Sequence, residues 1–288
     1  MWNFLIKTAP LILFSLIAFA ANSVLCRLAF THSTIDGGSF TIIRILSGAI
    51  MLWILVFLNQ KRIAKPNNNA SWLGALSLFG YCAAFSYAYL HLDTALGALI
   101  LFGTVQLVII GTSITSSEKT SLRTWGGVVL ALCGFAYLMF PTEVNESKIS
   151  VVGTGLMILS GISWAIYTLL GRKSETPLAD SAIHFSRALY FCVPLAASFL
   201  FLHSPYITTK GLFLAIASGA ITSGMGYAIW YKVLPRLTRL QAGVIQLNVP
   251  IVAALGGVIF VGESITLSFI VATVLLLGGV LITLVPEK

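Results

Sequence analysis

Two arginines, Arg44 and Arg187, are the residues of this sequence whose type and position point most directly to chemistry. Each lies near the start of a long apolar run. A charge inside the hydrocarbon layer costs about 2.5–3.5 kcal/mol on insertion scales, so each side chain should face other helices or a water-filled cavity. There a guanidinium can bind a carboxylate or phosphate through paired hydrogen bonds. The alternative is that each side chain extends to the nearby headgroups or bonds backbone carbonyls.

Other polar and aromatic side chains lie deep in the apolar runs. His184 lies one helical turn before Arg187 and shares its face, which permits either a proton relay or a structural hydrogen bond. Trp164 and Tyr227 are the strongest aromatic candidates, because indole N–H and phenol O–H groups at depth need polar partners. Packing between helices is the alternative for every aromatic. The predicted binding residues are Asn22, Arg44, Tyr81, Phe85, Trp164, Tyr167, His184, Arg187, Tyr227, Trp230 and Gln246.

Gln246 and Pro250 stand one helical turn apart in a further apolar run. Proline has no N–H, so Pro250 leaves the Gln246 carbonyl without its normal amide partner. We therefore expect a kink here, with a free carbonyl beside an amide side chain, as is common near the midplane of carriers. A packing kink without a ligand is the alternative.

Composition identifies the elements that must position these residues. Hydrophobic residues make up 58% of the chain and charged residues 9%, whereas a soluble domain carries about 25% charged residues. The chain is therefore expected to be an all-α integral membrane protein, because lipid requires every backbone polar group to be paired within its own segment. Ten runs are long enough to span a bilayer: 8–28, 39–58, 71–90, 94–114, 122–140, 152–171, 181–202, 210–231, 240–261 and 266–285.

The positions of the basic residues predict the topology. With the N-terminus inside, the inner segments hold 12 of the 17 Lys and Arg residues, which favours both termini in the cytoplasm. This also explains the net charge of +8 without nucleic acid as a partner. The inner basic residues are Lys7, Lys61, Arg62, Lys65, Lys119, Arg123, Arg172, Lys173, Lys232, Arg236, Arg239 and Lys288.

The chain contains an internal repeat with an offset of 145 residues. Ser15–Arg27 (S-L-I-A-F-A-A-N-S-V-L-C-R) corresponds to Ser160–Arg172 (S-G-I-S-W-A-I-Y-T-L-L-G-R), and Glu118 corresponds to Glu263. Five helices per copy is an odd number, so the second copy must insert upside down. The predicted units are a first five-helix repeat over 1–141, a connector over 142–150 and an inverted second repeat over 151–288. Such repeats place a binding site between them near the midplane, which is the main argument for a transporter.

At this point the sequence resembles a known family. The W-A-I-Y-T-L-L-G-R start of the second half and the Asn248–Glu263 run, N-V-P-I-V-A-A-L-G-G-V-I-F-V-G-E, are similar to the EamA-type branch of the drug/metabolite transporter superfamily. The first half departs from the pattern, with Val105 where Pro250 predicts a proline and Ser117 before Glu118. The resemblance implies an inner-membrane carrier of small metabolites or drugs, often an exporter.

Equally informative is where the acidic residues stand. None of the nine lies in the middle of a predicted helix, although cation exporters and many proton-coupled carriers use an intramembrane carboxylate. The sequence therefore predicts facilitated transport or exchange without coupling through a buried carboxylate. It also favours neutral, zwitterionic or anionic solutes, although aromatic faces can still hold a cation. The acids are Asp36, Asp93, Glu118, Glu143, Glu146, Glu175, Asp180, Glu263 and Glu287.

Enzyme motifs are absent from the sequence. It has no H-E-x-x-H, no G-x-S-x-G and no Gly-rich loop ending in Lys-Ser/Thr, which excludes ATP-driven pumping by this chain alone. Its four cysteines lack metal-ligand spacing, so we expect no metal and no cofactor.

The sequence thus predicts a carrier that moves an amino acid or a related carboxylated or zwitterionic solute across the inner membrane by alternating access, as export or exchange. The alternatives are an exporter of drugs or aromatic cations, and a non-transporting membrane enzyme or partner subunit. The expected partners are the solute and the lipid bilayer, with the chain a monomer or a homodimer.

Overall fold

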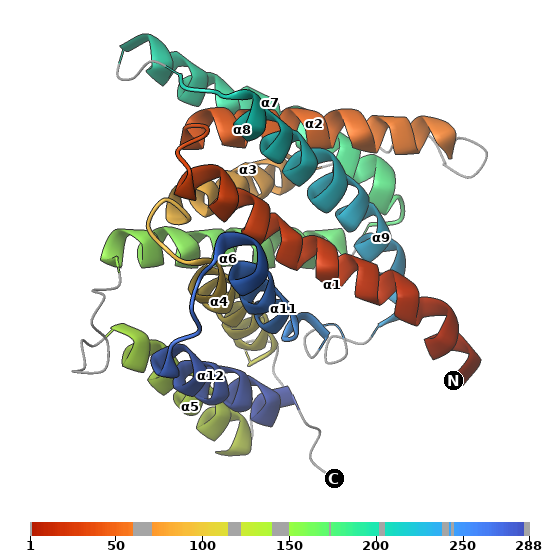
Figure 1. The fold of residues 1–288 in the computed structure, drawn as a ribbon. Coiled ribbons are helices and arrows are strands. Elements are labelled where there is room, and N and C mark those ends of the chain that lie inside the picture. Colours follow the sequence, from red (N-terminus) through yellow and green to blue (C-terminus); the bar gives the residue numbers. More distant parts are fainter. Residues whose placement is uncertain are drawn as a thin grey trace.

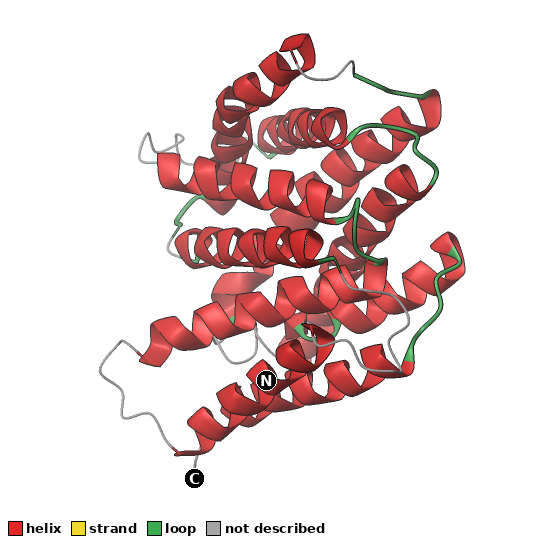
Figure 2. Ribbon diagram, turned by 90° about the vertical axis from the view of Figure 1, so that its left-hand side faces the viewer, coloured by secondary structure: helices red, strands yellow, loops and turns green. Residues whose placement is uncertain are grey.

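The structure of the protein is a computed structural model that describes residues 2–59, 71–114, 122–139, 150–172, 174–201, 205–237, 242 and 245–284. Glu118 and positions 142–149 of the predicted connector lie outside these residues. The described residues are helical and contain no strand, apart from one isolated bridge between Ile35 and Ile207 (Figure 2). The prediction of an all-α fold is confirmed.

The helices follow the apolar runs closely. Side chains of Asp36, Ser71, Ser150 and Thr208 begin four of them by accepting a hydrogen bond from an N–H two or three residues on. The elements are α1 (Trp2–Thr31), α2 (Gly37–Leu58), α3 (Trp72–Ala88), α4 (Thr94–Ile114), α5 (Leu122–Met139), α6 (Val151–Gly171), α7 (Pro177–Phe201), α8 (Thr209–Ile216), η2 (Ala217–Met225), α9 (Gly226–Val233), η3 (Leu234–Arg236), α11 (Val249–Gly256), η4 (Gly257–Val261) and α12 (Leu267–Leu284).

Several of these helices are suited to a bilayer by length and composition. Among the described residues, five segments are long and apolar enough to cross it, and four further apolar helices are shorter. The five are Thr8–Thr31, Gly37–Leu58, Thr94–Thr112, Val151–Gly171 and Thr209–Val233. The expectation of a membrane protein is therefore supported by the helices themselves.

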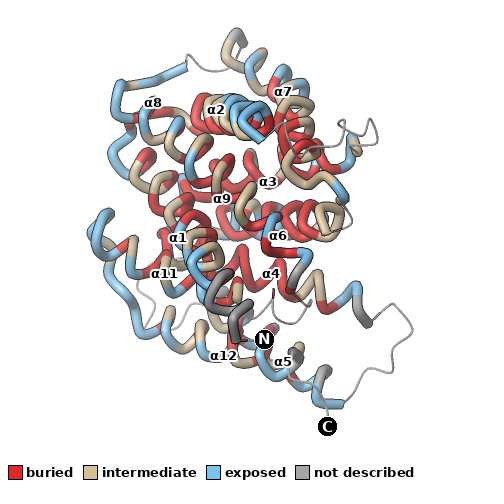
Figure 3. The backbone as a smooth tube through the Cα atoms, turned by 90° about the vertical axis from the view of Figure 1, so that its right-hand side faces the viewer, coloured by how far each residue is buried: buried red, intermediate tan, exposed pale blue. Residues whose placement is uncertain are grey.

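The helices pack together in one bundle (Figure 1). Helix α3 packs on α6, α2 packs on α7 and η2, and α1 packs on α8, η2, α9 and α11. Helix α4 joins α6 to α11, while α5 packs mainly on α12 at one edge of the bundle. Buried residues concentrate between α1, α2, α3, α6 and α9, and exposed residues lie on the outer faces (Figure 3).

The predicted helix over 210–231 is not a uniform α-helix. Its middle, Ala217–Met225, is the π-helix η2, which separates α8 from α9. A Cβ on Gly219 would collide with Ser47 Oγ and with the carbonyl oxygen of Arg44, so η2 lies directly against the backbone of α2. Extended π-helices are rare and occur frequently at functional sites.

The helix predicted over 240–261, with a kink at Pro250, is interrupted in the structure. A turn at Leu247 and Asn248 interrupts it, and α11 begins at Val249. Pro250 lies in the first turn of α11, where a missing N–H removes no hydrogen bond. The proline therefore helps to begin a helix here and does not kink one, because the chain has already turned before it.

Candidate functional site

Arg44 lies in α2 with its side chain wholly buried in the centre of the bundle. Its Nη2 donates to the hydroxyl of Tyr81 at 2.9 Å and lies 3.5 Å from that of Tyr227, and its Nε donates to Ser223 Oγ at 3.2 Å. Its Nη1 has no hydrogen-bond partner among the described residues. Hydrogen bonds thus fix the guanidinium through Nε and Nη2, and the N–H groups of Nη1 remain available to a ligand.

The charge of Arg44 is stabilised by aromatic rings. Its Cζ lies 4.9 Å from the ring centre of Tyr81 and 4.8 Å from that of Phe85, both on α3. The ion pairs found in the described part of the chain involve Arg27, and none includes Arg44. A buried charge without a counterion carries a large desolvation cost, which a bound anion would offset.

Asn22 of α1 connects three other elements around Arg44. Its Nδ2 donates to the Tyr81 hydroxyl at 3.1 Å, and its Oδ1 accepts from Ser218 at 2.5 Å and from Thr222 at 3.1 Å. The hydroxyl of Tyr81 therefore accepts hydrogen bonds from both Asn22 and Arg44. Because each polar group of Asn22 is used, it holds Tyr81 and the π-helix η2 in fixed positions.

Aromatic rings close the other side of the site. The ring of Trp164, on α6, lies 4.9 Å from that of Tyr81 and 4.8 Å from that of Tyr227, on α9. Phe19 of α1 lies 5.8 Å from Trp164 and 5.6 Å from Trp230. The indole Nε1 atoms of both tryptophans are buried and lack a hydrogen-bond partner in the described residues.

These residues form one connected set, which we call the Arg44 cluster. Tyr167 joins it through its ring contact with Trp164 at 5.7 Å, and His184 of α7 joins through Tyr167 at 5.6 Å. The cluster consists of Phe19, Asn22, Arg44, Tyr81, Phe85, Trp164, Tyr167, His184, Ser218, Thr222, Ser223, Tyr227 and Trp230.

Nine of the eleven predicted binding residues belong to the Arg44 cluster, and two lie elsewhere. The guanidinium of Arg187 lies 5.0 Å from the ring centre of Trp72. The 145-residue offset pairs Arg44 with Leu189, which is two residues after Arg187. Two residues of an α-helix correspond to a rotation of roughly 200°, so Arg187 points to a different side of its helix from the counterpart of Arg44. Gln246 is buried ahead of the turn before α11, and its Oε1 has no partner in the described residues. Binding of substrate by these eleven residues stays a prediction.

Four members of the cluster were not predicted from the sequence. Ser218, Thr222 and Ser223 face Asn22 and Arg44 because η2 turns its hydroxyls toward α1 and α2. Their signal is the run of small and hydroxyl residues from Ala217 to Gly224. Phe19 is marked in the sequence only as the repeat counterpart of Trp164.

Comparison with known proteins identifies the family of this chain. The model of the EamA-like transporter family matches residues 151–285. An uncharacterized protein of Pseudomonas aeruginosa, PA1977, is 43% identical over 98% of this chain and 96% of its own length. The chain belongs to the EamA-like transporter family. This protein is therefore a membrane transporter and not an enzyme, as the sequence predicts.

Two further relatives and one solved structure extend the comparison. The uncharacterized transporter YwfM of Bacillus subtilis is 28% identical over 87% of this EamA-like transporter and 85% of its own length. The threonine/homoserine exporter RhtA of Escherichia coli is 28% identical, with 78% of this chain and 74% of the relative covered. A crystal structure with 17% identity has the same fold, with a TM-score of 0.65 over 94% of this chain and 96% of that one.

Proposed function

We propose that this EamA-like transporter carries a small carboxylate-bearing solute, such as an amino acid, and that Arg44 binds the carboxylate. The observation that carries the proposal is the buried guanidinium of Arg44, whose Nη1 has no partner and whose charge has no counterion in the described residues. A carboxylate supplies the missing charge together with two acceptors that match the guanidinium fork.

Further unpaired donors lie in the Arg44 cluster besides Arg44 Nη1. The indole Nε1 atoms of Trp164 and Trp230 are donors without partners in the described residues, and the cluster's two other unpaired polar atoms, the Tyr167 hydroxyl and His184 Nε2, can also accept a hydrogen bond. A ligand with acceptor oxygens would pair with the three donors, whereas an ammonium group beside Arg44 would meet a like charge. The rings of Phe19 and Trp164 would cover the apolar part of the solute. The 28% identity to a threonine/homoserine exporter supports an amino acid as the carboxylate.

Alternating access is the transport mode that the packing supports best. Helix α3 packs on α6 in the way that η2 and α9 pack on α1, and α4 packs on α6 as α11 packs on α1. A shift of 145 residues converts each of these helix pairs into the other, which is what ten helices in inverted repeats over 1–141 and 151–288 would give. The Arg44 cluster draws on helices of both repeats. The basic residues support an inner-membrane location with cytoplasmic termini.

Transport of an aromatic cation is the second candidate, because the rings around Trp164 and Tyr227 offer faces to a cation. Arg44 opposes it by charge. The two candidates therefore differ in their response to Arg44: removal of its charge abolishes carboxylate binding but relieves the repulsion of a cation.

Reconstitution into liposomes tests the proposal. Purified transporter is assayed for flux of a panel of radiolabelled amino acids, other carboxylates and aromatic cations, after a thermal-shift screen has ranked the ligands. We expect flux of a carboxylate, reduced more than about tenfold by Arg44→Gln, since a charge-assisted hydrogen bond contributes about 1.5–3 kcal/mol. Arg123→Gln, the same change at an exposed arginine of α5, should retain the flux. Cation flux that survives or rises in Arg44→Gln would establish the second candidate, and no flux of any panel member contradicts both.

A further inference from the structure

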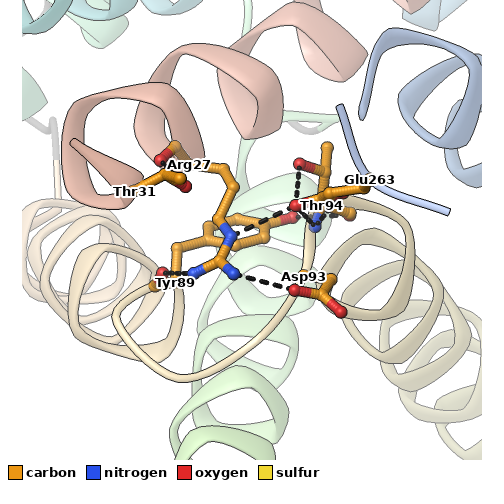
Figure 4. Close-up of polar contacts among 6 residues, drawn as sticks. All are labelled: Arg27, Thr31, Tyr89, Asp93, Thr94 and Glu263. Carbon is orange, nitrogen blue, oxygen red and sulfur yellow. Dashed lines mark hydrogen bonds and ion pairs between the residues drawn. The ribbon is translucent and has the colours of Figure 1, made fainter. Parts of the chain in front are cut away.

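A second charged network lies near the C-terminal end of α1, around Arg27 (Figure 4). The guanidinium of Arg27 donates from Nε to Glu263 Oε1 at 3.1 Å, from Nη2 to Asp93 Oδ1 at 2.8 Å and from Nη1 to the carbonyl of Tyr89 at 3.2 Å. Arg27 therefore uses all three nitrogens, and its partners come from two separate parts of the chain, the connection between α3 and α4 and the segment after η4.

Glu263 holds the beginning of α4 as well as Arg27. The N–H of Thr94, the first residue of α4, donates to both carboxylate oxygens of Glu263 at 3.1 and 3.0 Å, and its hydroxyl donates to Oε1 at 3.1 Å. A carboxylate at a helix N-terminus interacts favourably with the helix dipole. The cap of α4 is thus supplied by a residue 169 positions further along the chain.

The backbone around Glu263 is shaped for this contact. Gly262 has φ +78°, a left-handed conformation that favours glycine, and the N–H of Glu263 donates to the carbonyl of Gly257 at 3.2 Å. A Cβ on Gly257 would lie 2.5 Å from Glu263 Oε2 and 3.1 Å from Thr94 Cβ. The beginning of η4 therefore lies directly against the start of α4, with the carboxylate of Glu263 beside both.

An unbroken series of buried rings leads from this network to Arg44. The ring of Tyr89 lies 4.7 Å from that of Phe85, and Phe85 lies 5.4 Å from Tyr81. The backbone of Tyr89 bonds Arg27, while Phe85 and Tyr81 lie against Arg44. Arg27 and Glu263 therefore lie at the end of this ring series that is farther from Arg44.

We propose that Arg27, Tyr89, Asp93, Thr94 and Glu263 form a gate, which is closed in this structure and must open for solute to reach Arg44 from this end. Opening separates Glu263 from both Arg27 and the N-terminus of α4, so the C-terminal part of the chain moves away from α1 and α4. The gate rests on the proposed alternating access. It is nevertheless testable without a transported solute.

Two native cysteines report on the gate. Cys26, next to Arg27, and Cys82, one turn before Phe85, are both buried between the gate and the Arg44 cluster. Cys192 of α7 is also buried, but it lies on a helix that supplies no member of the gate. N-ethylmaleimide is applied to the purified full-length protein. It labels each buried cysteine at a rate set by how often the helices around that cysteine open, and mass spectrometry identifies the labelled sites.

We expect Glu263→Gln to accelerate labelling of Cys26 and Cys82 by at least about fivefold, since local opening governs access to buried groups. Asp93→Asn removes only the negative charge of the exposed partner of Arg27 and keeps an acceptor oxygen, so it should give a smaller increase at the same two sites. Glu175→Gln, the same change at an exposed glutamate, should leave all rates unchanged. Unchanged rates at Cys26 and Cys82 in both gate variants overturn the gate. An equal rise at Cys192 also overturns it, because the opening is then global.

Discussion

Arg44 Nη2 donates to the hydroxyl of Tyr81 at 2.9 Å, across the contact between α2 and α3. The same ring lies 4.9 Å from the Arg44 Cζ, so Tyr81 contacts the guanidinium both through its hydroxyl and through its face. Tyr81 therefore orients Arg44, and the Nη1 edge is left for a ligand.

Tyr81→Phe separates these two contacts. It keeps the ring and removes the acceptor, so Arg44 and Asn22 both lose a hydrogen-bond partner. A hydrogen bond to a charged group contributes about 1.5–3 kcal/mol, so we expect the affinity for the best carboxylate ligand to fall roughly tenfold or more in a thermal-shift titration. Tyr190→Phe, on the exposed face of α7, should leave the affinity unchanged. Equal affinity in Tyr81→Phe would show that the hydroxyl does not position Arg44.

Asn22→Asp tests whether the missing counterion is what makes the site select anions. The substitution keeps the size of Asn22 and places a carboxylate beside the hydroxyl that also binds Arg44. The new charge would compensate the guanidinium, so we expect weaker binding of carboxylates, by about tenfold or more, and stronger binding of organic cations.

Asn22→Ala is the control for this change, because it removes the same hydrogen bonds without adding a charge. If the two variants bind carboxylates and cations alike in competition assays, charge compensation does not set the selectivity.

Gly219→Ala should destabilise the contact between η2 and α2. Its Cβ would collide with Ser47 Oγ and with the carbonyl of Arg44, which is backbone and cannot move aside by rotation. Overpacking of this kind costs about 1–3 kcal/mol, so the melting temperature should fall. Gly155→Ala in α6, where no atom lies within 4 Å of the added Cβ, is the matched control and should melt as the parent does or later. A melting temperature equal to that of Gly155→Ala would mean that η2 does not lie against α2.

The sequence predicts the membrane helices and most of the Arg44 cluster for one shared reason. Polar groups in apolar helices must face the interior of the bundle, so Asn22, Arg44 and Trp164 converge once the helices pack. The repeat offset adds which helices correspond. Arg187 stands two residues before Leu189, the counterpart of Arg44 in this offset, and its guanidinium lies against Trp72 and not in the Arg44 cluster.

What the sequence could not predict depends on contacts between distant residues. A π-helix and an α-helix differ by one residue in hydrogen-bond spacing, and the choice at Gly219 is linked to its close approach to Arg44 in another helix. Likewise Arg27 and Glu263 are 236 positions apart, and no local pattern pairs them. The turn before Val249 is invisible for a similar reason, because Pro250 is compatible with a kink and with a helix start.

Trp164→Phe tests the role of an indole that packs well but lacks a hydrogen-bond partner. Phenylalanine retains an aromatic ring against Tyr81 and Tyr227, so we expect little change in helix packing. The lost Nε1–H would no longer donate to a ligand carboxylate, and the affinity should fall about five- to tenfold in thermal-shift titrations, as for one hydrogen bond. Trp125→Phe, at an exposed position on α5, controls for the general loss of an indole. If Trp164→Phe binds the carboxylate as tightly as Trp125→Phe does, the indole serves packing alone and the ligand lies elsewhere along Arg44.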